Sequence, residues 1–143
     1  MTTEHDPLHQ PAAPVVTEPT PDVQLQMLVR LIGQDPDAAL PITLTVGGGH
    51  LSGDLISHEA WTAEWARSLR SFDGPGAQLL KHFPEEVDQA VADRQGRPGP
   101  QRLPQWIHLR DATVAAGTGR PVVMPLWRGR LADVAGWSLG KPA

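Results

Sequence analysis

The chain of 143 residues contains no cysteine. It therefore cannot form disulfides, bind a metal through thiolates or use a cysteine nucleophile. No apolar run approaches the ~20 residues that a helix needs to cross a membrane. The first residues, MTTEHDP, have neither the basic nor the apolar region of a secretory signal. We therefore expect a single-domain cytoplasmic protein without a membrane partner.

Motifs that carry catalysis are also missing. The six histidines, at 5, 9, 50, 58, 82 and 108, show no HExxH-like spacing in the core of the chain. No G-x-S-x-G elbow is present. The glycines at 47–49 lack the lysine and Ser/Thr of a phosphate loop and lead into an alternating segment, which favours a hairpin turn. We expect no enzyme, metal site or cofactor.

Charge is divided unevenly along the chain. Residues 1–93 hold 4 Lys/Arg and 14 Asp/Glu, a net charge of −10. Residues 94–143 hold 8 Lys/Arg and 2 Asp, a net charge of +6, and the sum is the overall −4. The two halves can balance each other within one molecule or attract each other between molecules.

The N-terminal part divides into a tail and a helix. Residues 1–20 are rich in Pro and Thr, with three acids and no base, and are expected to be disordered. Residues 21–33 are expected to be a helix that begins with Thr20 as N-cap and ends at Gly33. Its apolar residues follow the i, i+3, i+4, i+7 spacing of one helix face: Leu25, Leu28, Val29 and Ile32.

The clearest pattern is a hairpin over residues 41–57. Apolar and polar residues alternate on both sides of the glycines at 47–49, which is typical of two strands joined by a tight turn. Gly53 inside the second strand indicates a bulge, a bend or a close backbone approach.

A helical insert is expected over about 58–93, with Ser57 as its N-cap. One stripe of its first helix is aromatic and apolar and is expected to be core, although a partner groove is the alternative: Trp61, Trp65, Leu69 and Phe72. The acidic residues Glu85, Glu86 and Asp88 are interpreted as complementing a helix dipole.

Strand character returns after a basic Pro/Gly-rich loop at 94–105. Residues 106–115 alternate, and a further β segment follows over 122–140, with Pro125 at an edge or a bend. In that segment Arg128 and Arg130 share a face opposite Trp127.

This order predicts an α+β fold. About five short strands with glycine corners suit a small bent β-barrel of SH3/Sm-like topology, with an N-terminal helix and a helical insert. An α+β sandwich is the alternative. The domain is expected to span 21–140.

Single-stranded nucleic acid is one candidate partner, because arginines and tryptophans together can bind phosphates and stack on bases. The overall acidity and the lack of a dense basic patch argue against it. The residues concerned are Arg102, Arg110, Arg120, Arg128, Arg130, Trp106 and Trp127. A small Sm-like barrel that binds RNA therefore stays as the alternative function.

Three blocks resemble the gas vesicle accessory protein U family: ITLTVGGGHLSGDLIS at 42–57, WIHLRDA at 106–112 and WRGRLADVAGWSLG at 127–140. Their order and spacing are similar to those of the family. The resemblance implies a non-enzymatic accessory protein, associated with gas vesicles, which are hollow shells that give buoyancy. It implies that the protein binds gas vesicle proteins or itself and supports assembly or clustering.

The expected partner-binding residues are the exposed arginines and the adjacent tryptophan: Trp127, Arg128, Arg130 and Arg110.

Overall fold

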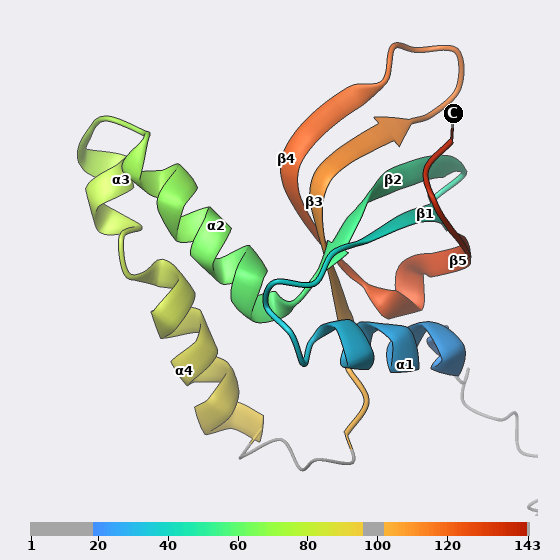
Figure 1. The fold of residues 1–143 in the computed structure, drawn as a ribbon. Coiled ribbons are helices and arrows are strands. Elements are labelled where there is room, and N and C mark those ends of the chain that lie inside the picture. Colours follow the sequence, from blue (N-terminus) through green and yellow to red (C-terminus); the bar gives the residue numbers. More distant parts are fainter. Residues whose placement is uncertain (1–18, 96–101, 143) are drawn as a thin grey trace, which may run out of the picture.

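The structure is a computed structural model that describes residues 19–95 and 102–142. Five antiparallel strands form one sheet in the order β4-β3-β2-β1-β5 (Figure 1). The strands are β1 (Leu40–Val46), β2 (Gly49–Ile56), β3 (Trp106–Ala115), β4 (Val122–Arg130) and β5 (Val134–Leu139). The helices are α1 (Val23–Ile32), α2 (His58–Arg70), α3 (Pro75–Leu79), α4 (Phe83–Gln95) and the 3₁₀ turn η2 (Leu131–Asp133).

The α+β class is confirmed, but the barrel is not. The sheet is open, with β4 at one edge and β5 at the other. Between these strands the chain passes through η2, which buries Leu131 in the core, and β5 then pairs with β1. The expected SH3/Sm-like closure is therefore not formed. Most of the expected tail at 1–20 lies outside the described residues.

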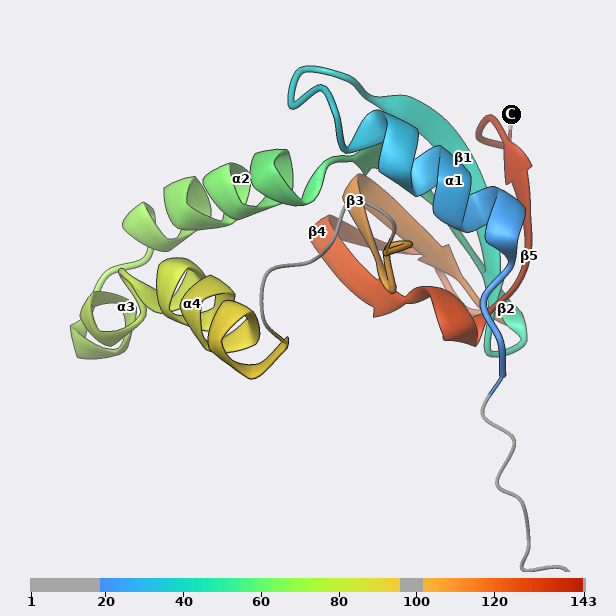
Figure 2. The ribbon, with the colours of Figure 1, turned by 90° about the horizontal axis from the view of Figure 1, so that it is seen from below.

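Helix α1 lies across the sheet and covers its core (Figure 2). Its predicted stripe is confirmed, since Leu25 and Val29 are buried in the core cluster with the inward residues of β1, β2 and β3. The predicted N-cap was wrong by two residues. The helix begins at Val23, and the Asp22 carboxylate accepts a hydrogen bond from the Gln24 amide at 2.8 Å.

The hairpin is confirmed. Gly47 and Gly48 have φ of +55° and +80°, as a two-residue turn between β1 and β2 requires. Gly53 lies where the register between β2 and β3 shifts. A Cβ at Gly53 would lie 3.1 Å from the Arg110 carbonyl oxygen, so a side chain there would require β2 and β3 to move slightly apart.

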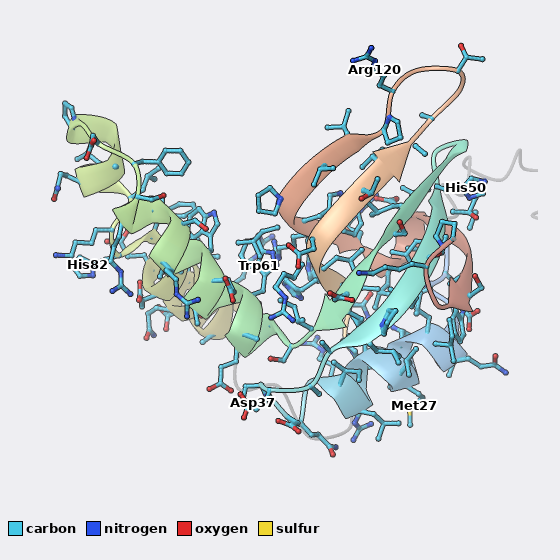
Figure 3. All side chains as sticks on the ribbon, turned by 45° about the horizontal axis from the view of Figure 1, so that its top comes forward. Met27, Asp37, His50, Trp61, His82 and Arg120 are labelled. Atoms are coloured by element: carbon cyan, nitrogen blue, oxygen red, sulfur yellow. The ribbon has the colours of Figure 1, made fainter. Side chains whose placement is uncertain are left out.

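The helical insert forms an arm of α2, α3 and α4 that projects from the sheet (Figure 1). The expectation that its aromatic stripe is core was wrong: no residue of α2 is buried, and Phe72 is 64% exposed. Trp61 and Trp65 stack on each other, and Trp65 contacts Phe83 of α4. The stripe therefore mainly joins α2 to α4, and Trp61 lies where the arm meets the sheet (Figure 3).

Candidate functional site

A cleft of about 610 Å³ lies where the arm leaves the sheet. Its walls come from the C-terminal end of α1, the β2–α2 junction, α4, the segment before β3, and strands β3 and β4. We call it the Arg128 cleft. The lining residues that carry the argument are His58, Asp88, Arg102, Trp106, His108 and Arg128.

His108 forms the floor of the Arg128 cleft. The strand register places it opposite Ile56 of β2 and Arg128 of β4. Its side chain is 5% exposed. Burial, followed by the positive charges of His58 and Arg128, lowers the pKa of His108 to about 3. The imidazole is therefore neutral at physiological pH.

Hydrogen bonds connect His108 to both β4 and the arm. Arg128 Nε donates to His108 Nε2 at 3.1 Å, so this nitrogen is an acceptor. His58 Nδ1 lies 3.1 Å from the same nitrogen, and His58 Nε2 lies 2.9 Å from Asp88 Oδ1. Through these two contacts His58 links β3 to α4.

The guanidinium of Arg128 is held in place without an acidic partner. Its Cζ lies 3.9 Å from the centroid of a Trp106 ring, a cation–π contact. Its Nε is fixed by the neutral His108. Within residues 19–95 and 102–142, Arg128 forms no salt bridge. Desolvation lowers the pKa of Arg128, although the guanidinium stays charged.

The expected partner-binding residues lie on two faces of the sheet. Trp127 packs against the hydrophobic core, whereas Arg128 is on the opposite face. Arg130 pairs with Asp133 at 3.0 Å. Arg110 lies 3.9 Å from carboxylate oxygens of both Glu64 and Asp111. Of the four, only Arg128 contributes to the cleft.

Sequence reasoning missed three residues of the Arg128 cleft. His58 and His108 are 50 positions apart, and their contact depends on the sheet register and on how α2 leaves the sheet. Asp88 was assigned to the helix dipole, but it binds His58 from α4. The alternation of 106–115 was the available signal, because it places His108 and Arg110 on one face.

In the part of the chain that the structure describes, no group of three His, Cys, Asp or Glu could hold a metal ion. Within the same residues, no helix has both the length and the hydrophobicity needed to cross a membrane.

Residues 22–142 match the family model described as gas vesicle protein GvpU-like. No curated protein and no solved structure matches the chain.

Proposed function

The chain belongs to the GvpU-like family of gas vesicle proteins, and from this we infer a non-enzymatic accessory role. The protein binds gas vesicle proteins or other copies of itself and so supports vesicle assembly or clustering. It acts in the cytoplasm at the vesicle surface. The family match over residues 22–142 is the observation that carries this proposal.

Two surface features suit a binding protein. The arm exposes apolar side chains away from the sheet, among them Leu79, which is 84% exposed. The sheet carries arginines beside the arm, and of these Arg128 is the main candidate for partner binding. Arg110 and Arg130 would form its charged surroundings, and Trp127 would support β4 from the opposite face.

A flotation experiment tests this proposal. Purified protein is mixed with isolated gas vesicles, and the buoyant fraction is collected over a series of salt concentrations. We expect the protein to float with the vesicles, and less of it at high salt if charge contributes. An unrelated acidic protein of similar mass is the control. Absence of co-flotation at every salt concentration would contradict the proposal.

A further inference from the structure

We propose that the Arg128 cleft binds a single acidic side chain of a partner protein, carried on a peptide segment with apolar neighbours. This inference deepens the proposed function, because it gives the chemistry by which a vesicle protein would be held. Three observations support it: the geometry of Arg128, the charge of the cleft and its apolar walls.

The guanidinium of Arg128 is preorganised to bind a carboxylate. The cation–π contact with Trp106 holds Cζ of the guanidinium over the ring, and the hydrogen bond to His108 holds its Nε. Arg128 lines the cleft, and its Nη groups have no hydrogen-bond partner within the described residues. A guanidinium with free Nη groups binds carboxylates in a planar, often bidentate arrangement. Since His108 is neutral, it anchors Arg128 without neutralising its charge.

Arg102 is a second cation of this cleft. It is exposed, and no salt bridge joins it to another residue that the structure describes. The negative charge of Asp88 acts to raise the pKa of Arg128, but Asp88 forms no salt bridge with it among the described residues and accepts a hydrogen bond from His58. The cleft therefore contains two guanidinium groups, those of Arg102 and Arg128, that form no salt bridge within the described residues.

The charges in the cleft favour one anionic group over a polyanion. Three arginines and two carboxylates line it, which gives a net charge of +1 before His58 is counted: Arg30, Arg102, Arg128, Glu59 and Asp88. A nucleic-acid backbone would bring several phosphates close to these carboxylates. In addition, Arg128 occupies a face of the Trp106 ring, which a base would need for stacking.

The remaining walls of the cleft are apolar. Val29 of α1, Ile56 at the end of β2 and Val87 of α4 all line it. Val87 is partly exposed, whereas Val29 and Ile56 are 9% and 2% exposed, so Val87 offers most of the apolar surface that the neighbours of the bound acid can cover. The fitting ligand is therefore a peptide in which one Glu or Asp is flanked by aliphatic residues.

The test is an NMR titration of the full-length protein with short peptides. The probe is acetyl-Ser-Leu-Glu-Val-Ser-amide, and its matched control has Gln in place of Glu. The resonances followed are the Arg128 Nε–H and the Trp106 indole N–H. We expect both to shift with the Glu peptide, with at least tenfold weaker binding of the Gln peptide and weaker binding at high salt.

Variants locate the site. Arg128→Gln is expected to weaken binding of the Glu peptide at least tenfold, and Arg128→Lys to weaken it as well, because the fork geometry is lost. Arg120→Gln is the matched control, because this exposed arginine on the β3–β4 loop lies outside the cleft (Figure 3), and it should bind like the wild type. If Arg128→Gln disturbs the amide spectrum, the affinity for the Glu peptide is compared in Arg128→Lys and Arg102→Gln instead.

Four results would overturn the inference. The first two are equal binding of the Glu and Gln peptides, and equal losses of binding in the Arg128 and Arg120 variants. The other two are tighter binding of acetyl-Ser-Leu-Val with a free carboxyl end, and tighter binding of decathymidylate through Arg128. The flotation experiment is independent of these results. If the peptide binds but the protein does not float with the vesicles, only the proposed function is contradicted. If the Arg128→Gln variant still floats with the vesicles and the peptide does not bind, only this inference is contradicted.

Discussion

The indole ring of Trp127 lies over Gly129, two residues along β4. A Cβ placed on Gly129 would come within 2.6 Å of Trp127 Cζ2. Trp127 itself packs against the hydrophobic core, so the ring cannot move away without losing core contacts. The position of the Trp127 ring therefore explains why residue 129 is a glycine.

Gly129→Ala is expected to destabilise the fold by about 1–3 kcal/mol, because the added methyl group displaces the indole ring. The free energy of unfolding is measured by urea denaturation. Gly136→Ala is the matched control in β5, where the nearest atom to a new Cβ is 3.8 Å away, and it should change stability by less than about 0.5 kcal/mol.

A double-mutant cycle isolates the contact. In a Trp127→Leu background the smaller side chain leaves room for the methyl group, so Gly129→Ala should have much less effect than in the wild type. An equal loss of stability in both backgrounds would show that the ring is not the reason for the glycine.

The buried imidazole of His108 predicts a pH dependence of stability. Its pKa is about 3 in the folded protein, whereas the pKa of a free histidine is about 6.5. Between these values the unfolded chain binds the proton and the folded one does not, so stability falls as the pH drops from 6.5 towards 3. This one group contributes at most about 1.4 kcal/mol per pH unit in that window.

His108→Gln should reduce the slope of unfolding free energy against pH between about 4 and 6. The slope is compared and not the free energy itself, because the change in packing alters the free energy of unfolding at every pH. The groups that face His108 are His58 from α2 and Arg128 from β4, with Asp88 of α4 behind His58. His50→Gln, at an exposed position on β2, is the control and should keep the wild-type slope. An unchanged slope in His108→Gln would mean that the imidazole titrates normally in the fold.

Features set by neighbouring residues were predictable from the sequence. The turn at Gly47 and Gly48 and the cap at Ser57 each depend on a local backbone requirement. The spans of α1 and β3 followed from apolar spacing in the same way. The α+β class follows from these elements together.

Features set by distant residues were not predictable. Asp22 is the N-cap of α1, and its other carboxylate oxygen accepts a hydrogen bond from Trp137 Nε1 at 3.1 Å, a residue 115 positions away. Whether β5 closes a barrel depends on which strand it pairs with, and alternation alone does not specify that. The Arg128 cleft was missed for the same reason, because α2 and α4 bring His58 and Asp88 to β3 from another part of the chain.

The hydrogen bond between His58 and Asp88 predicts that α4 is held to the body of the protein through this pair. Asp88→Asn removes the carboxylate that the His58 N–H contacts at 2.9 Å. We expect faster amide hydrogen exchange in α4 and little change in β1, β2 and β3, because the sheet does not depend on this contact. Asp93→Asn, which changes a contact within α4, is the control. Equal exchange rates in wild type and Asp88→Asn would show that the aromatic contacts alone hold the helix.

The exposed apolar residues of the arm predict self-association. Phe72 and Leu79 are 64% and 84% exposed, and neither belongs to the core cluster. The variant Phe72→Ser, Leu79→Ser should therefore keep its circular dichroism spectrum while showing a lower apparent mass in light scattering at high protein concentration, since less apolar surface is available for contact. Val23→Ser removes an exposed apolar side chain on α1 and is the control. If the arm variant and Val23→Ser lower the apparent mass equally, or neither does, the arm is not the associating surface.

Repeating the measurement over a salt series separates this contribution from attraction between the acidic and basic halves of the chain, because only the latter weakens with salt.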